Sequence, residues 1–318
     1  MKKIFLSLLA SLLAFSLSSC ILFSELPIPA SSSVRVTFVD GESSETKVFS
    51  SAASVEYPVL AARGNLVFSG WYYDSEITVP VMTGDSLGDS VTLYAGWSLD
   101  YENVTNKIFS EYIMANLEIN VKNVKAGFFG GASNSKGSGV IFKEQDGFYY
   151  LLTNNHVVEP DEGYTVSSYT VTDCYGNDYS AALVDAAPEY DLAVLRISKG
   201  DVELRVLELA DKGLVTGDDV IAIGQPGGLK NSVTYGEVVK VDVFEGGGES
   251  DGDSFDFPII WHDAPVDHGS SGGMLLNHEL ELAGINFAIG TSDDDSFVCG
   301  FAVGIGEVRE YLTLIGLE

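Results

Sequence analysis

The chain has 318 residues, 46 of them acidic and 17 basic, so its formal net charge is −29 at pH 7. This charge repels phosphate backbones and excludes nucleic acid as an expected partner. Hydrophobic residues make up 46% of the chain, and its 34 glycines separate many short runs rich in Val, Tyr, Phe and Thr, which predicts a mostly β protein with more than one domain.

Residues 1–19 have the pattern of a bacterial secretion signal. Lys2 and Lys3 precede the apolar stretch Ile4–Phe15, which is too short for a comfortable membrane span. The following Leu17-Ser18-Ser19-Cys20 resembles the lipoprotein processing site, in which cleavage leaves the cysteine as a lipidated N-terminus. This resemblance implies lipidation of Cys20 and a location in the cell envelope, anchored at the outer membrane or the cell surface. The alternative is an ordinary secretion signal with a chance cysteine.

A spacer over residues 20–33 leads into a compact β pattern over residues 34–98. This pattern resembles the Listeria–Bacteroides repeat. The matching features are Val36-Thr37-Phe38, Pro58, Phe68-Ser69-Gly70-Trp71-Tyr72 and Leu93-Tyr94-Ala95-Gly96-Trp97. The resemblance implies a small β-grasp-like module, either a spacer or a ligand-binding unit. We expect Trp71 and Trp97 to be buried in its core.

Residues 99–125 are predicted to form a helical linker. Val104, Ile108, Tyr112 and Ala115 recur at helical spacing, with polar residues among those between them. A second domain follows over residues 126–318, where apolar runs alternate with turns rich in Gly, Asn and Asp.

Three motifs in the second domain suggest nucleophilic catalysis. His156 follows the apolar run Tyr149–Leu152, Asp191 precedes another apolar run, and Ser271 lies in the glycine-rich turn His268–Gly273. A serine hydroxyl needs a base to take its proton, and histidine suits this role near neutral pH. A carboxylate then fixes the tautomer of the histidine. His156, Asp191 and Ser271 are therefore the candidate catalytic residues.

Each motif alone is weak evidence, but the order His, Asp, Ser is that of the chymotrypsin class. Together with Ile221–Gly228, Ser232–Val238 and Gly284–Asn286, the motifs make residues from about Ala126 to Tyr311 similar to the HtrA/DegP-type trypsin-like serine proteases. The resemblance implies a trypsin-like double β-barrel of two six-stranded barrels with the three residues in the cleft between them.

The same resemblance implies the remaining site residues. The N–H groups of Gly269 and Ser271 would form the oxyanion hole. Phe287, Ala288 and Ile289 would pair with the substrate as an added strand, and Cys299 and Gly300 would line its pocket. No acidic residue marks the pocket floor, so small or medium apolar side chains are expected there.

Several features depart from this family. Phe287 occupies a place where relatives often have a small hydroxyl residue near the aspartate, which leaves the support of Asp191 open. No PDZ domain follows, so regulation through one is not expected. The stretch Phe244–Phe257 takes the place of a regulatory loop and is either a gate or a simple insertion. A homo-oligomer is a candidate state.

The sequence thus predicts a lipid-anchored serine endopeptidase that hydrolyses unfolded or surface proteins, with polypeptides as its substrates. The alternative is a catalytically idle surface adhesin built on a protease fold. No metal or cofactor is expected, because the acidic runs Glu249–Asp256 and Asp293–Asp295 do not match a known calcium loop. Cys174 and Cys299 are expected to be unpaired.

Overall fold

The computed structural model describes residues 33–125, 130–225, 231–243, 255–292 and 296–318. The chain forms two compact units: the first comprises the described residues up to Val59 together with Gly70–Gly96, and the second comprises Leu60–Ser69 and Trp97–Glu318. Cys20, residues 244–254 of the expected loop and the acidic residues 293–295 lie outside the described residues. Across the described ranges, no helix has the length and apolar character needed to span a membrane.

The N-terminal sheet has the strand order β2-β1-β4-β3, with β1 and β4 parallel. Its elements are β1 (Val34–Asp40), β2 (Ser43–Phe49), the short 3-10 helix η1 (Ala52–Ser54), β3 (Leu66–Tyr72) and β4 (Ser90–Leu99). Trp71 is buried as expected: its ring meets Phe38 edge-on, with centroids 4.8 Å apart, and its Nε1–H donates to the oxygen of Pro58 at 2.7 Å. Trp97 is only half-buried.

The expected helical linker is shorter than predicted. Helix α1 (Tyr101–Ser110) begins where the Asp100 carboxylate accepts the Asn103 N–H at 3.1 Å, and it buries Val104 and Ile108. After the 3-10 helix η2 (Tyr112–Ala115), the chain enters strand β5 (Asn116–Val124). The prediction of helix was wrong for residues 116–124, because apolar residues there alternate with polar ones and their buried side chains fill a barrel.

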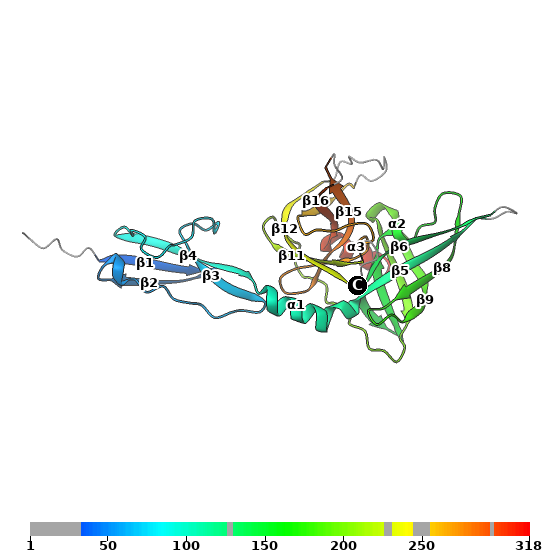
Figure 1. Cartoon of the computed structure of the whole chain (residues 1–318), viewed down its shortest axis with the longest axis horizontal. Helices are drawn as coiled ribbons and strands as arrows, with labels where there is room; N and C mark the ends of the chain where they lie inside the picture. The colour runs from blue at the N-terminus through cyan, green and yellow to red at the C-terminus, as the bar shows by residue number, and fades with distance from the viewer. Residues whose placement is uncertain (1–32, 126–129, 226–230, 244–254, 293–295) are drawn as a thin grey trace, which may run out of the picture. The chain divides into compact units, whose positions relative to one another are not determined.

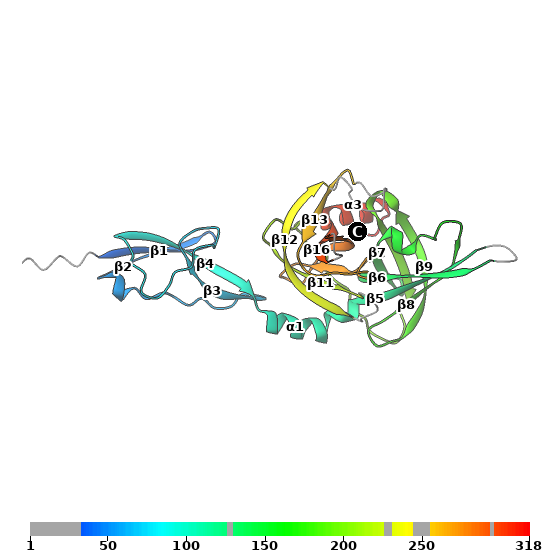
Figure 2. The same ribbon diagram turned by 45° about the horizontal axis from the view of Figure 1, so that its top comes forward.

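Two closed barrels of six strands each confirm the predicted fold (Figures 1 and 2). The first has the order β10-β7-β6-β5-β8-β9 and the second the order β11-β12-β13-β16-β15-β14. The remaining strands of the first barrel are β6 (Ala132–Gln145), β7 (Phe148–Thr153), β8 (Thr165–Thr172), β9 (Asp178–Ala187) and β10 (Leu192–Ser198). The strands of the second barrel are β11 (Asp219–Gly224), β12 (Ser232–Val243), β13 (Pro258–His262), β14 (Met274–Leu276), β15 (Leu282–Thr291) and β16 (Phe297–Gly304).

The two barrels share part of their hydrophobic core. Leu152 and Leu192 of the first barrel belong to the same buried cluster as Ile221 and Met274 of the second. Helix α3 (Ile305–Leu314) adds Tyr311 to this cluster. Removing this apolar surface from water fixes the barrels against each other.

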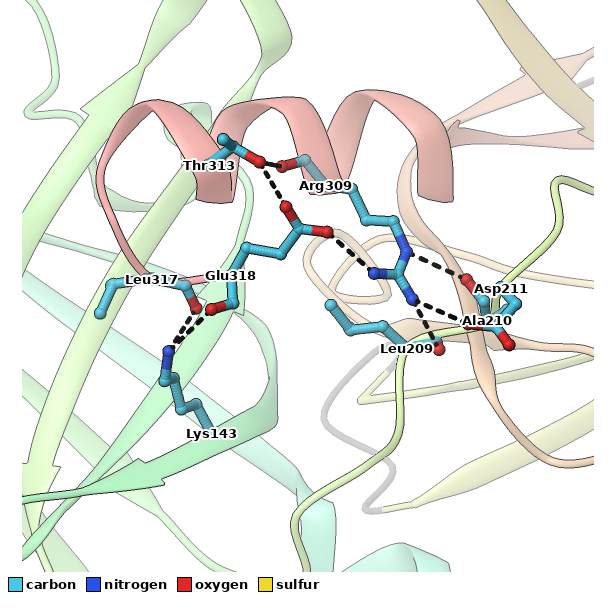
Figure 3. A network of polar contacts seen from close by, with 8 residues as sticks. All are labelled: Lys143, Leu209, Ala210, Asp211, Arg309, Thr313, Leu317 and Glu318. Atoms are coloured by element: carbon cyan, nitrogen blue, oxygen red, sulfur yellow. Dashed lines mark hydrogen bonds and ion pairs between the residues drawn. The ribbon is translucent and has the colours of Figure 1, made fainter.

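Polar contacts at the end of α3 reinforce this arrangement (Figure 3). The Arg309 guanidinium donates to the main-chain oxygens of Leu209 and Ala210, in the segment that connects the barrels, at 3.1 and 3.2 Å, and to the Glu318 carboxylate at 2.9 Å. Lys143 of β6 donates to the main-chain oxygen of Leu317 at 2.9 Å. The residues after α3 therefore link the connecting segment to the first barrel.

Cys174 and Cys299 are unpaired, as the sequence favoured. Burial raises the pKa of both thiols, so both stay protonated at neutral pH. A protonated thiol is a poor nucleophile. The cysteines of the described residues are therefore weak candidates for catalysis.

Candidate active site

His156 and Asp191 meet at the end of two paired strands. His156 lies in the short helix α2 (Asn155–Val158) directly after β7, and Asp191 lies between the 3-10 helix η3 (Pro188–Tyr190) and β10. The strands β7 and β10 pair, with Thr153 opposite Ala193. This pairing brings His156 and Asp191 next to each other. Oδ2 of Asp191 lies 2.8 Å from Nδ1 of His156, and its Oδ1 accepts the His156 main-chain N–H at 2.9 Å.

This contact determines which nitrogen of His156 carries its proton. An ionised carboxylate only accepts hydrogen bonds, so Nδ1 must hold a hydrogen and the neutral ring keeps a lone pair on Nε2. The side chain is 48% exposed, whereas that of Asp191 is only 13% exposed. The histidine side chain is therefore accessible, whereas the carboxylate that orients it is largely covered.

Asp191 itself is held in an unusual backbone conformation. Its φ of 48° lies in the left-handed region, which Asp tolerates better than most residues. The Asn154 side-chain amide donates to its main-chain oxygen at 2.9 Å, and the preceding Tyr190 stacks on Phe257 with ring centroids 5.7 Å apart. These contacts keep the carboxylate aimed at His156.

Ser271 lies in a tight turn before β14. The Ser270 N–H donates to the Asp267 oxygen and the Gly273 N–H donates to the Ser270 oxygen, at 2.9 and 2.8 Å. The Ser271 hydroxyl donates to the main-chain oxygen of Phe287 at 3.1 Å. Within the described part of the chain, no main-chain oxygen is recorded as an acceptor for the N–H groups of Gly269 and Ser271.

Ser138 of the first barrel anchors this turn. Its N–H donates to the Ser271 oxygen at 2.7 Å, its hydroxyl donates to the Gly269 oxygen at 2.8 Å, and the same hydroxyl oxygen accepts the Gln225 N–H at 2.9 Å. A Cβ on the neighbouring Gly137 would lie 2.7 Å from Val157 and 3.0 Å from the Ser271 oxygen. The segment that carries His156 and the turn that carries Ser271 therefore flank the same glycine.

The residues expected to bind substrate lie on β15 and β16. Ile289 pairs with Gly300 across these strands, and Ala288 pairs with Phe301. On the other side of β15, the described pairing with β14 extends only as far as Ile285. The edge of β15 at Phe287, Ala288 and Ile289 therefore has no neighbouring strand on that side among the described residues.

Phe287 lies in the core of the second barrel. The residue is 5% exposed, and its ring packs against Phe255 and Phe301, with centroids 5.2 and 6.1 Å apart. The described side-chain and main-chain partners of Asp191 include His156 and Asn154, both of the first barrel.

The comparisons agree with this geometry. Residues 137–285 match the family model of the trypsin-like peptidase domain. The chain is 40% identical over 179 residues to serine protease Do-like HtrA of Bacillus subtilis, covering 55% of this chain and 38% of that protein. It is 35% identical over 175 residues to periplasmic serine endoprotease DegP of Escherichia coli K12, covering 54% and 34%. The chain thus spans between a third and two fifths of these relatives.

A solved structure is similar to this chain in fold. The HtrA-type protease AlgW, determined with a decapeptide, superposes with a TM-score of 0.53 at 27% identity and covers 66% of each chain. This match supports a trypsin-like double barrel as the fold of the two closed barrels.

Sequence reasoning missed a polar residue in the core of the double-barrel domain. His262 of β13 is fully buried, and its Nε2 lies 3.0 Å from the Asn286 side-chain oxygen. Burial lowers the pKa of His262 to about 4, so the ring is neutral near pH 7. A histidine in an apolar strand gives no functional signal in a sequence, because its neighbours come from distant segments.

The turn that carries Ser271 requires glycine at position 272. Gly272 has a φ of 81°, and a Cβ there would lie 2.0 Å from the Ser138 oxygen and 2.3 Å from the Thr153 hydroxyl. We expect Gly272→Ala to lower the free energy of unfolding by about 3 kcal/mol or more, through backbone strain and steric overlap. Chemical denaturation measures this. Gly213→Ala, where a Cβ meets nothing within 4 Å, is the control and should change stability little.

Stability should fall in mild acid because of His262. Its pKa in the folded state, about 4, is below its ordinary value of 6.5, so only the unfolded chain takes up the proton as the pH drops below 6.5. The free energy of unfolding should decrease between pH 6.5 and 4 by up to about 3 kcal/mol from this group. Denaturation of wild type and His262→Gln across this range isolates the contribution, and parallel curves would contradict it.

Proposed function

We propose that the trypsin-like domain is an HtrA-type serine endopeptidase in which Ser271 is the nucleophile, His156 the general base and Asp191 the residue that orients the base. The observation that carries this proposal is the contact of 2.8 Å between Asp191 and Nδ1 of His156, which keeps the hydrogen on Nδ1 and the basic lone pair on Nε2. The names of the curated relatives, serine protease and serine endoprotease, support the same activity.

In the proposed reaction, the Ser271 hydroxyl leaves the Phe287 oxygen and transfers its proton to Nε2 of His156 while Oγ attacks the peptide carbonyl carbon. The oxyanion that forms is bound by the N–H groups of Gly269 and Ser271. The C–N bond then breaks, and the departing amine takes the proton from His156. Water next attacks the acyl group with His156 again as base, which releases the acid product and regenerates Ser271.

We propose extended polypeptides as substrates, as found in unfolded proteins or flexible surface segments. The edge of β15 at Ala288 and Ile289, which no strand of the described residues pairs with on the side of β14, supports this, because an extended chain can bind there as an additional strand. Cys299 and Gly300 are buried on the neighbouring strand and would line an apolar pocket. Such a pocket favours substrates with a small or medium apolar side chain on the residue before the cleaved bond.

We also propose that the enzyme is attached to the cell envelope through lipid on Cys20, with residues 20–33 as a spacer and residues 34–98 as a Listeria–Bacteroides repeat. The motif Leu17-Ser18-Ser19-Cys20 supports the anchor, and the sheet order with parallel central strands β1 and β4 supports a β-grasp module. The relative DegP is named periplasmic, which agrees with an envelope location. Assembly into a homo-oligomer is also part of this proposal.

The activity is tested with a fluorophosphonate probe, which reacts with activated serines. Wild type should be labelled and Ser271→Ala should not, while His156→Ala should lower the labelling rate by about six orders of magnitude. Asp191→Asn should lower it by about four orders of magnitude, because the amide can stabilise the wrong tautomer of His156.

The control is Ser270→Ala, which leaves the hydroxyl of Ser271 in place and should be labelled. Folding of every variant is checked by circular dichroism. A folded wild-type protein that neither reacts with the probe nor cleaves an unfolded protein would contradict the proposal and favour the alternative of a binding protein.

The anchor predicts a separate outcome in bacterial cells. Wild type should incorporate labelled palmitate and fractionate with membranes, because several acyl chains give stable anchoring. Cys20→Ser should lose the label and leave the membrane fraction, whereas Cys174→Ser should behave as wild type. Equal palmitate incorporation by wild type and Cys20→Ser would remove the lipid anchor from the proposal.

A further inference from the structure

His262 is a buried histidine that contacts Asn286 of β15, the strand whose main chain meets the turn that carries Ser271. It ends β13, is fully buried, and packs so closely on β16 that a Cβ on Gly300 would lie 2.3 Å from its Cε1 and 2.6 Å from its Nε2. The reaction proposed above does not use this histidine. Its position nevertheless connects it to that reaction through Asn286.

The hydrogen-bond partners of Asn286 determine the direction of the contact with His262. Its side-chain Nδ2 donates to the main-chain oxygen of Met274 at 3.1 Å, so its Oδ1 is the atom that faces His262. An amide oxygen only accepts, and therefore Nε2 of His262 must carry the hydrogen and donate. The bond of 3.0 Å is thus His262 Nε2–H to Asn286 Oδ1.

Asn286 in turn holds the turn that carries Ser271. Its main-chain oxygen accepts the Gly272 N–H at 2.8 Å, and its main-chain N–H donates to the Gly273 oxygen at 3.0 Å. Asn286 therefore makes hydrogen bonds through both its side chain and its main chain. The side chain binds β13 and β14, and the main chain binds Gly272 and Gly273, the two residues after Ser271.

The next residue, Phe287, is an extra residue in its strand. Asn286 pairs with Ala302 and Ala288 with Phe301, so Phe287 is bulged out of the ladder between β15 and β16. A bulge interrupts the regular ladder and redirects the residue that it contains. Here the bulged residue is the one whose main-chain oxygen accepts the Ser271 hydroxyl.

We propose that His262 is a positioning residue for Ser271: by donating to Asn286 it fixes the bulge at Phe287 and the Gly272–Gly273 turn, and so sets the place of the nucleophile. This inference rests on the proposed peptidase function. The side-chain hydrogen bonds of Asn286 restrain its conformation beside the irregular ladder, where strand pairing alone restrains it less.

The test compares two variants of similar length that differ in the donor. Glutamine places an amide N–H near the position of Nε2, whereas methionine fills comparable space with no donor. With an unfolded protein as substrate, His262→Met should lower kcat about tenfold with KM changed less than about twofold, as expected for loss of one buried hydrogen bond. His262→Gln should keep kcat within about threefold of wild type.

Two further measurements separate positioning from general stability. Hydrogen exchange of peptides covering residues 269–273 should be faster in His262→Met than in His262→Gln at a pH and temperature where both are folded. Combining His262→Met with Asn286→Leu should lower kcat much less than the product of the two single effects, because both act through one bond. His278→Gln, at a half-buried histidine outside this hydrogen-bond network, is the control and should match wild type.

The outcomes are distinct. Equal kcat for the methionine and glutamine variants, or independent effects of His262 and Asn286, would overturn the positioning role even in an active enzyme. A wild-type protein with no activity would contradict the proposed function instead. The exchange measurement would then still decide whether His262 holds the turn, since it needs no catalysis.

Discussion

The site depends on the contact between Ser138 of the first barrel and the serine turn of the second. The N–H and the hydroxyl of Ser138 donate to the main-chain oxygens of Ser271 and Gly269, respectively. The hydroxyl oxygen of Ser138 also accepts the N–H of Gln225. The main chains approach so closely that a Cβ at Gly272 would overlap the Ser138 oxygen. Because His156 comes from the first barrel and Ser271 from the second, this contact helps to fix the two residues relative to each other.

Each barrel then orients its own part of the site. In the first, the pairing of β7 with β10 brings His156 to Asp191, and Asn154 and Tyr190 hold the aspartate in its left-handed conformation. In the second, the bulge in β15 and the pair His262–Asn286 surround the serine turn. Buried polar groups need partners, and these hydrogen bonds give them partners while restricting the backbone to one arrangement.

Much of the architecture was predictable from local pattern. The alternation of apolar and polar residues indicated strands, the glycine-rich turn indicated tight backbone at Ser271, and the order of His156, Asp191 and Ser271 indicated the class of barrel. The prediction of helix over residues 116–124 was wrong, because it extended the helical spacing of the preceding segment into a run whose alternation belongs to β5. Short segments satisfy both periods, and tertiary packing decides between them.

The sequence by itself determined the residue types that this chemistry needs, their order along the chain, and the glycines that a tight turn requires. Only the tertiary structure decided which atoms meet: Asp191 with Nδ1 of His156, Ser138 with the serine turn, and His262 with Asn286. The physical reason is that a hydrogen bond depends on distances of about 3 Å between groups far apart in the chain. Periodicity describes the faces of single strands, whereas closure of the barrels brings those faces together.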